Sequence, residues 1–168
     1  MASDVPASFT EYVHARRPAL VRMAFLLCGD DHLAEDLVQN ALIKAVGRWK
    51  KIGDSPEAWL RRVMVNDHIS GWRKHRRERL RADVPERAVP ADDLHGRLSL
   101  AEALTMLAPR QRAVVVLRYY EDLTEAETAR VLGVSVGTVK SQHSDALRRL
   151  RGVVPGLADA DVAGPRPE

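Results

Sequence analysis

Residues 124–151 have the sequence TEAETARVLGVSVGTVKSQHSDALRRLR, and this stretch decides the fold of the C-terminal part of the chain. Thr124 followed by Glu127 is typical of a capping box at a helix start, and Gly133 is typical of a helix end because glycine tolerates positive φ. Ser135 can cap a second helix. The stretch therefore predicts two helices joined by a tight turn, which is a helix-turn-helix.

The second predicted helix has an apolar face and a polar, basic face. The apolar face carries Val139, His143, Ala146, Leu147 and Leu150. The opposite face carries Thr138, Ser141, Ser144, Asp145 and Arg148, flanked by Lys140, Gln142, Arg149 and Arg151. Such an outer face is typical of a helix that enters a DNA major groove. An ordinary αα-hairpin with a solvated face is the alternative, which the agreement of caps, turn and apolar stripe disfavours. On the apolar face, His143 is interpreted as a satisfied core histidine.

Composition and cysteine content limit the classes of protein to consider. The chain has 168 residues, of which 45% are hydrophobic and 29% are charged, as in a globular protein. No apolar run approaches the roughly 18 residues of a membrane-spanning helix, and the N-terminus lacks the basic and apolar blocks of a signal peptide. Cys28 is the only cysteine, which excludes an internal disulfide and a cysteine metal cluster. We therefore expect a cytoplasmic protein, and the net charge of +3 does not by itself identify a nucleic-acid partner.

The N-terminal half predicts helices over 9–27 and 31–49. Pro18 is expected to mark a break or a helix start inside the first of them. Asp30 or Asp31 can cap the second helix. Its expected buried stripe consists of Leu33, Leu37, Ala41, Leu42 and Ala45.

A loop over 50–54 and a third helix are expected next. Ser55, Pro56 and Glu57 form a helix start signal, with a capping serine, a proline in the first turn and an acid. This helix runs into WRKHRRERLR at 72–81, where six of ten residues are Lys or Arg. A solvated face is one interpretation of this run, but its density beside an aromatic residue favours a patch that contacts phosphates.

The remaining segments define the predicted domain boundaries. Residues 82–96 contain two prolines and no apolar period, which is typical of a linker. Helical patterns resume at 97–107 and again from Pro109 through Tyr120, and the tail after residue 152 has the composition of a disordered segment. The sequence thus predicts an all-α protein with domains at 1–81 and 97–152, a flexible linker at 82–96 and a disordered tail at 153–168.

Three segments together resemble a known family. DDHLAEDLVQNALIKAVGRW (30–49), SPEAWLRRVMVNDHISGWRKHRRE (55–78) and LAPRQRAVVVLRYYEDLTEAETARVLGVSVGTVKSQHSDALRRLR (107–151) occur in the expected order. They resemble the extracytoplasmic-function (group 4) sigma factors of the sigma-70 superfamily, in their small actinobacterial form. The resemblance implies a region 2 helical bundle and a region 4 helix-turn-helix domain.

The resemblance also implies a polymerase-docking surface and two DNA-binding surfaces. Residues expected on the clamp of the largest polymerase subunit are Glu35, Asp36, Leu37, Gln39 and Asn40. Residues expected near the melted −10 strand are Asn66, Trp72, Arg73, Lys74, Arg76 and Arg77. Residues expected on the −35 duplex are Thr138, Lys140, Ser141, Gln142, Ser144, Arg148 and Arg149. Many relatives have Arg in place of Gln142, so a different −35 base preference is expected. For the acids of 31–36, stabilisation of the helix dipole remains the alternative interpretation.

The function implied is that of a promoter-specificity subunit without catalysis, cofactor or metal. Its expected partners are promoter DNA and core RNA polymerase, through the clamp and the flap of the second-largest subunit, and an anti-sigma factor remains open. It is expected in the cytoplasm, at the nucleoid when engaged, with no membrane partner. A stand-alone helix-turn-helix repressor or activator is the alternative. A third hypothesis is a nuclease with a metal on Asp30, Asp31, His32, Glu35 and Asp36, for which no second ligand cluster is present.

Overall fold

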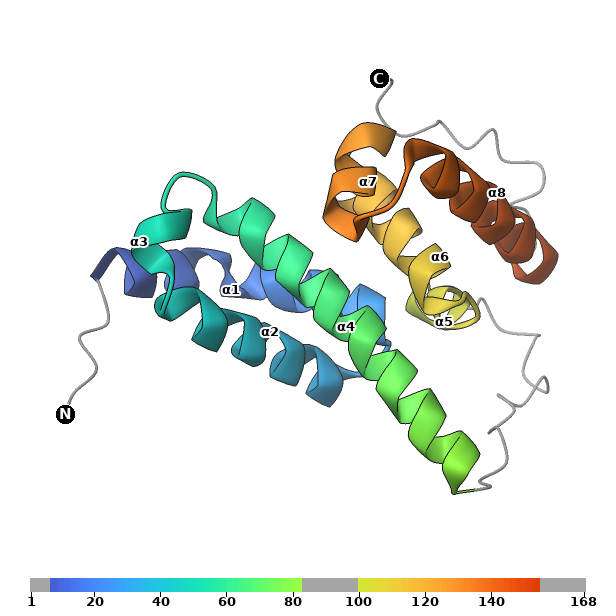
Figure 1. Ribbon diagram of the computed structural model, residues 1–168, viewed down its shortest axis with the longest axis horizontal. Helices are drawn as coiled ribbons and strands as arrows, with labels where there is room; N and C mark the ends of the chain where they lie inside the picture. Colours follow the sequence, from blue (N-terminus) through green and yellow to red (C-terminus); the bar gives the residue numbers. More distant parts are fainter. Residues whose placement is uncertain (1–6, 83–99, 155–168) are drawn as a thin grey trace.

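The computed structural model describes residues 7–82 and 100–154, and every regular element in these ranges is a helix (Figure 1). The first four are α1 (Ala7–Cys28), α2 (Asp31–Val46), α3 (Trp49–Ile52) and α4 (Pro56–Arg81). The others are α5 (Leu100–Thr105), α6 (Pro109–Val115), the π-helix η1 (Val116–Tyr120), α7 (Glu125–Leu132) and α8 (Val136–Val153). The all-α prediction is confirmed. Predictions for the linker at 82–96 and the tail at 153–168 fall almost wholly outside the described residues. None of the described helices combines the length and apolar character needed to span a membrane.

α1, α2 and α4 form a bundle around an apolar core. Its fully or nearly fully buried members are Met23, Ala24, Leu27, Ala34, Val38, Ala41, Ala45, Leu60, Met64 and Val65. Small alanines on α2 let the helix backbones approach closely. At the surface, Arg16 pairs with Glu57 and Lys44 pairs with Asp67 at 2.6 Å. Such exposed pairs add at most about 1 kcal/mol each, so burial of the apolar stripes holds the bundle together.

The structure corrects several local predictions in this bundle. α1 continues through Pro18, because the proline lies on the exposed side of the helix and removes only one backbone hydrogen bond. Leu33 is 57% exposed rather than buried, because Ala34 and Val38 occupy the inner face of α2. Asp30 is the cap of this helix, since its Oδ1 accepts a hydrogen bond from Leu33 N at 2.9 Å.

The predicted loop at 50–54 contains the helical turn α3. Trp49 begins this turn, and its ring lies 5.0 Å from the ring of Phe9, while its Nε1 donates to Ser8 Oγ at 3.0 Å. α4 begins at Pro56 as predicted, but Ser55 makes no side-chain capping hydrogen bond. The fixed φ of proline at the first helical position is sufficient to start this helix.

The helix-turn-helix forms as its caps predict. Thr124 Oγ1 accepts from Glu127 N at 3.1 Å, and Glu127 Oε2 accepts from Thr124 N at 2.8 Å. Gly133 ends α7 in the left-handed conformation with φ 65°, and Ser135 caps α8. The predicted helix from Pro109 is confirmed, but its last turn widens into the π-helix η1.

The two domains pack against each other through one continuous apolar core. α5, α6 and α7 pack against α1 and α4, and Figure 1 shows this half of the molecule along one side of α4. The buried Arg112 of α6 donates from Nη1 to Leu27 O at 2.7 Å and from Nη2 to Thr105 O at 2.9 Å. Burial lowers the pKa of this guanidinium. Arg112 therefore joins the end of α1 to the turn between α5 and α6.

His68 of α4 is a half-buried histidine whose ring contacts the end of α1. His68 Nδ1 is 3.7 Å from Cys28 Sγ, and the Nε2 atom of His68 is buried without a hydrogen-bond partner. Burial lowers the pKa of His68 from 6.5 to about 4 and raises that of Cys28 to about 11. The folded protein therefore holds a neutral imidazole and a neutral thiol here.

We expect acid to destabilise the fold through His68. Its folded-state pKa is lowered, so between pH 6.5 and 4 the unfolded chain takes up a proton that the folded chain does not. The resulting loss of unfolding free energy approaches about 3 kcal/mol near pH 4. The unfolding free energy measured in urea should depend less on pH across this window in His68→Phe than in the wild type. His75→Gln, at an exposed position of the same helix, is the control, and an unchanged pH dependence in His68→Phe would contradict the assignment.

Candidate nucleic-acid interface

The inner face of α8 fixes the orientation of its outer face. Val139, Ala146 and Leu150 are buried, and Tyr119 Oη shares a hydrogen bond of 2.9 Å with His143 Nε2. Burial raises the pKa of Tyr119 and lowers that of His143, so both rings are neutral. The interpretation of His143 as a satisfied core histidine is therefore confirmed.

The outer face of α8 presents most of the predicted −35 residues to solvent. The exposed members are Lys140, Ser141, Ser144, Arg148 and Arg149. Lys140 Nζ is 3.5 Å from Glu125, and Arg148 is 3.0 Å from Asp145. These pairs are partly exposed and cost little to exchange for contacts with phosphates.

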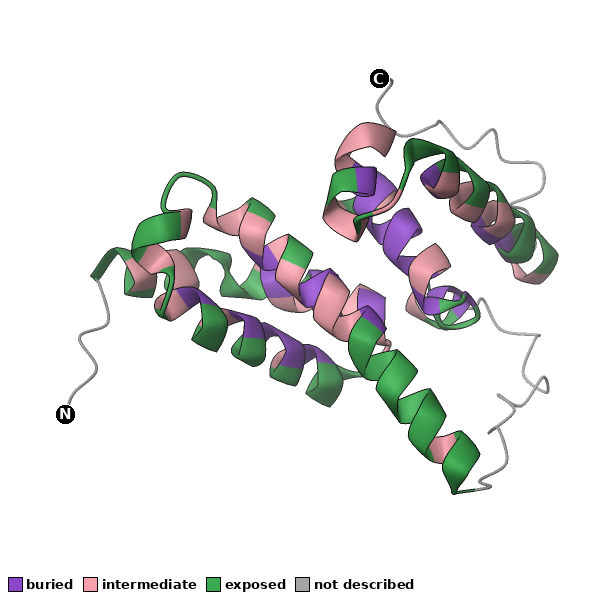
Figure 2. Cartoon of the chain, viewed as in Figure 1, coloured by how far each residue is buried: buried purple, intermediate pink, exposed green. Residues whose placement is uncertain are grey.

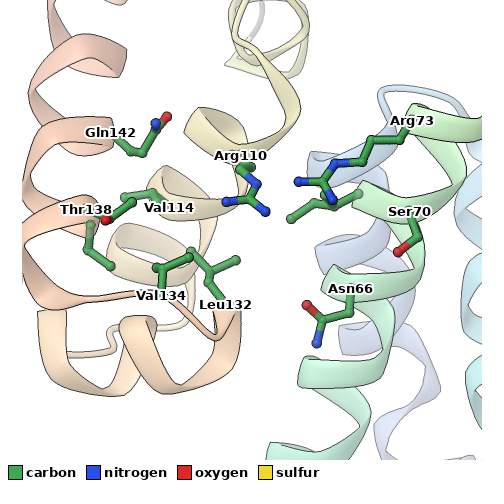
Figure 3. Close-up of a pocket in the computed structure, with 11 residues that line it drawn as sticks. Asn66, Ser70, Arg73, Arg110, Val114, Leu132, Val134, Thr138 and Gln142 are labelled. Carbon is green, nitrogen blue, oxygen red and sulfur yellow. The ribbon is translucent and has the colours of Figure 1, made fainter. Parts of the chain in front are cut away.

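The two remaining −35 candidates, Thr138 and Gln142, are half-buried. They line a small pocket that α4 closes from the other domain, with Asn66 and Arg73 on its far side (Figure 3). Arg110 of α6 also lines the pocket. The structure thus brings together candidates for both DNA elements.

Arg110 was not among the residues predicted for either DNA surface. Figure 3 places its side chain between the residues of α8 and those of α4. In the sequence it is one of many arginines, in the first turn of α6. Only the packing of α6 against α8 places it beside Thr138 and Gln142, so no local pattern could have found it.

The C-terminal part of α4 projects beyond the bundle as an exposed basic helix (Figure 2). Arg73, Lys74, Arg76 and Arg77 are exposed, and Trp72 is 40% exposed. The guanidinium of Arg76 lies 5.3 Å from the centroid of the Trp72 ring. An accessible aromatic ring among cations can stack on an unpaired base while the cations contact phosphates.

A third surface lies on α2 and contains apolar as well as polar side chains. Asp36, Gln39 and Asn40 are exposed as predicted, and Glu35 pairs with Arg17 of α1. Leu37, in contrast, is only 9% exposed and belongs to the core. The prediction that it lies on the docking surface is therefore wrong.

Two apolar residues complete this surface. Leu33 is 57% exposed and Ile43 is 61% exposed, and their spacing places them along the stripe of Asp36 and Asn40. Leu33 was predicted to lie in the core and was therefore not predicted for this surface. Apolar side chains beside polar ones are typical of a protein-binding surface.

Two of the five residues of the metal hypothesis already have partners in the structure. Asp30 caps α2 and Glu35 pairs with Arg17. Among the described residues, no three His, Cys, Asp or Glu side chains are grouped to hold a metal ion. The geometry therefore gives the nuclease hypothesis no support.

Comparisons with known proteins identify the family. The model for sigma-70 region 2 matches residues 12–78, and that for sigma-70 region 4 matches residues 97–150. The RNA polymerase sigma-E factor of Streptomyces avermitilis is 43% identical over 156 residues, which cover 90% of this chain and 87% of that protein. The ECF RNA polymerase sigma factor SigL of Mycobacterium tuberculosis is 36% identical, with 79% and 80% covered.

A solved structure agrees with these matches. The sigma factor RpoE, from its complex with the anti-sigma factor NepR of Bartonella quintana, is 30% identical with a TM-score of 0.69, and 93% of this chain and 99% of that chain are covered. The chain belongs to the sigma-70 family of RNA polymerase sigma factors, in its extracytoplasmic-function group. It therefore binds core RNA polymerase and directs it to promoters, and the stand-alone repressor or activator is not favoured.

We expect Ser135→Ala to destabilise the helix-turn-helix. Ser135 Oγ accepts from Thr138 N at 3.1 Å, and loss of such a cap costs about 1 kcal/mol of unfolding free energy. Thermal unfolding of the full chain measures the loss. Ser141→Ala, at an exposed position of the same helix, is the matched control and should be close to neutral. Equal stability of the two variants would show that the cap contributes nothing.

Proposed function

We propose that this sigma factor binds polymerase and DNA through three separate surfaces, which lie on the predicted domains 1–81 and 97–152. The exposed stripe of α2 docks on the polymerase clamp, the basic end of α4 holds the −10 strand, and the outer face of α8 reads the −35 duplex. The observation that carries this assignment is that each surface has the chemistry its ligand requires, within the family region to which that role belongs.

The docking surface on α2 combines exposed apolar and polar groups. Leu33 and Ile43 supply apolar area, and Asp36, Gln39 and Asn40 supply acceptors and donors between them. Desolvation of the apolar groups would provide affinity, while the polar groups would fix orientation. The flap of the second-largest polymerase subunit is proposed to hold the C-terminal domain.

The two DNA surfaces differ in the groups that they present. α4 offers Trp72 with Arg73, Lys74, Arg76 and Arg77, which suits a single strand with unpaired bases. α8 offers amide and hydroxyl side chains that can reach base edges in the major groove. Arg148, Arg149 and the newly found Arg110 are proposed to contact phosphates, which set affinity and register.

Further properties are proposed from the family and its relatives. We propose that the chain has no catalytic activity of its own and works in the cytoplasm. RpoE was solved with the anti-sigma factor NepR, and CnrH, 25% identical to this chain with a TM-score of 0.59, was solved with the cytosolic domain of CnrY. An anti-sigma factor is therefore a proposed partner of this chain as well.

Run-off transcription tests the proposal directly. Purified core RNA polymerase is supplied with sheared genomic DNA of the source organism, with and without the protein. Discrete transcripts that depend on the protein are expected, and their start sites give the promoter elements. Absence of stimulation, together with tight duplex binding by the protein alone, would instead support a stand-alone regulator.

We expect Gln142→Arg to change the preferred −35 base. Glutamine can bind adenine in a bidentate manner, whereas arginine prefers guanine, and a good bidentate pair is worth about 1–3 kcal/mol of discrimination. Binding of the holoenzyme to a −35 library should shift toward guanine at one position by about tenfold or more. Arg149→Ala is the control and should weaken binding to all −35 sequences by a similar factor. If Gln142→Arg changed the affinity for all −35 sequences equally, the placement of Gln142 on the recognition face would be wrong.

We expect Asp36→Ala combined with Gln39→Ala to weaken core polymerase binding. Both side chains are exposed in the middle of the α2 surface, so the fold should be unaffected, and a loss of about tenfold in affinity is expected. Fluorescence anisotropy of the labelled protein titrated with core enzyme measures it. Glu11→Ala on the exposed side of α1 is the control for a change of one charge. Unchanged affinity in the double variant would place the docking surface elsewhere.

A further inference from the structure

Two arginines from different domains converge on one cavity. Arg73 of α4 and Arg110 of α6 both line the small pocket between α4 and α8, which has a volume of about 90 Å³. Figure 3 shows their side chains pointing toward one another across this pocket. Arg110 is half-buried, whereas Arg73 is exposed. Two cations therefore approach each other at a place that is partly shielded from bulk water.

No carboxylate balances these two charges. The walls of the pocket contain no Asp or Glu, and none of the ion pairs found among the described residues includes Arg73 or Arg110. Other arginines between the domains are compensated, since Arg61 pairs with Glu121 and Arg112 donates to backbone carbonyls. Like charges repel more strongly where water is partly excluded, because the effective dielectric constant is lower. An anion between the two guanidinium groups would remove this repulsion.

Uncharged side chains supply further hydrogen-bond donors around the pocket. Ser70 of α4 contributes a hydroxyl and Gln142 of α8 contributes an amide. Asn66 and Thr138 also line the pocket, but the amide nitrogen of Asn66 and the hydroxyl of Thr138 already have partners. A cavity of this size has room for several water molecules, and therefore for one tetrahedral oxyanion. The planar fork of a guanidinium matches two oxygens of a phosphate group.

We propose that the pocket formed by Arg73, Arg110, Ser70 and Gln142 binds a phosphate-type oxyanion, which links α4 to α6 and α8. The ligand is inorganic phosphate or the terminal phosphate of a small phosphomonoester. Both present terminal oxygens that carry more than a single negative charge at neutral pH. The site follows from the packing of α4, α6 and α8 alone, so it does not depend on the DNA-binding roles proposed above.

A larger cleft of about 560 Å³ provides matched control variants. Arg62 of α4 and Arg130 of α7 line it, one from each domain, but Asp54 and Glu127 line it as well. Because its cations are accompanied by acids, we expect no oxyanion site there. Arg62→Gln and Arg130→Gln thus remove the same charge from the same two domains without touching the proposed pocket.

Thermal unfolding of the full chain, in phosphate and in chloride at equal pH and ionic strength, tests the proposal. Phosphate at about twenty times its dissociation constant should raise the Tm of the wild type by about 4–7 °C, and the rise should saturate. Arg73→Gln and Arg110→Gln should lose most of this rise, whereas Arg62→Gln and Arg130→Gln should keep it. Calorimetric titration with inorganic phosphate should detect binding to the wild type and the two controls but not to the two pocket variants.

The order of stability in the two solutions separates loss of the site from damage to the fold. Removal of one of two converging cations relieves their repulsion, so Arg110→Gln should have a Tm in chloride at least as high as that of the wild type. In saturating phosphate the wild type should become the more stable of the two. Arg110→Lys keeps the charge but not the planar fork, and it should bind phosphate about tenfold more weakly.

The choice of anion identifies the source of the ligand. A saturable rise in Tm with inorganic phosphate alone supports a site for the free anion, and a rise with adenosine monophosphate as well supports a site open to phosphomonoesters. An equal rise in the wild type and all variants overturns the proposal, because phosphate also stabilises proteins by exclusion from their surface. The proposal is equally overturned by a wild type without a saturable rise, or by a rise only with a thymidine tetranucleotide that lacks terminal phosphates. Either result leaves the DNA surfaces as proposed.

Discussion

The buried guanidinium of Arg112 is the contact on which the arrangement of the helices depends. The last carbonyls of a helix have no partner inside it, and Arg112 donates to Leu27 O at the end of α1 and to Thr105 O at the end of α5. Withdrawal of a cation from water is costly unless it is well hydrogen-bonded. The carbonyls therefore have to converge around Arg112, and this convergence fixes α6, and with it α8, relative to the N-terminal bundle.

The interface between the two domains combines an apolar core with a shielded ion pair. A shielded ion pair stabilises little compared with apolar residues of similar volume, because desolvation offsets most of its Coulombic energy. Arg61 of α4 donates from Nε to Oε2 of Glu121 at 2.7 Å across this interface. The apolar surface around Leu104 and Leu107 holds the domains together, whereas the polar contacts fix how they are oriented.

Local signals in the sequence predicted local structure well. The capping box of Thr124 and Glu127, the left-handed Gly133 and the cap of Ser135 were all correct, because each depends on residues within one turn of the others. Leu33 was misplaced, since an apolar residue at the edge of a helix stripe is buried only if a neighbour covers it. The pairing of Arg61 with Glu121 spans 60 residues, and no periodicity reports such a contact. The exposed polar face of α8 could be predicted from the sequence, whereas the place of Arg110 beside it depends on the packing of α6.

The arginines show why basic composition alone could not locate the binding surfaces. Arg112 is buried on carbonyls, Arg61 is shielded on a carboxylate, and Arg73, Arg76 and Arg77 are exposed. Of these five arginines, only Arg73, Arg76 and Arg77 are available to an incoming phosphate in this structure. The positive charge presented to DNA therefore depends on how the helices pack as well as on the sequence. A modest net charge of +3 is compatible with a protein that concentrates exposed arginines at the end of α4.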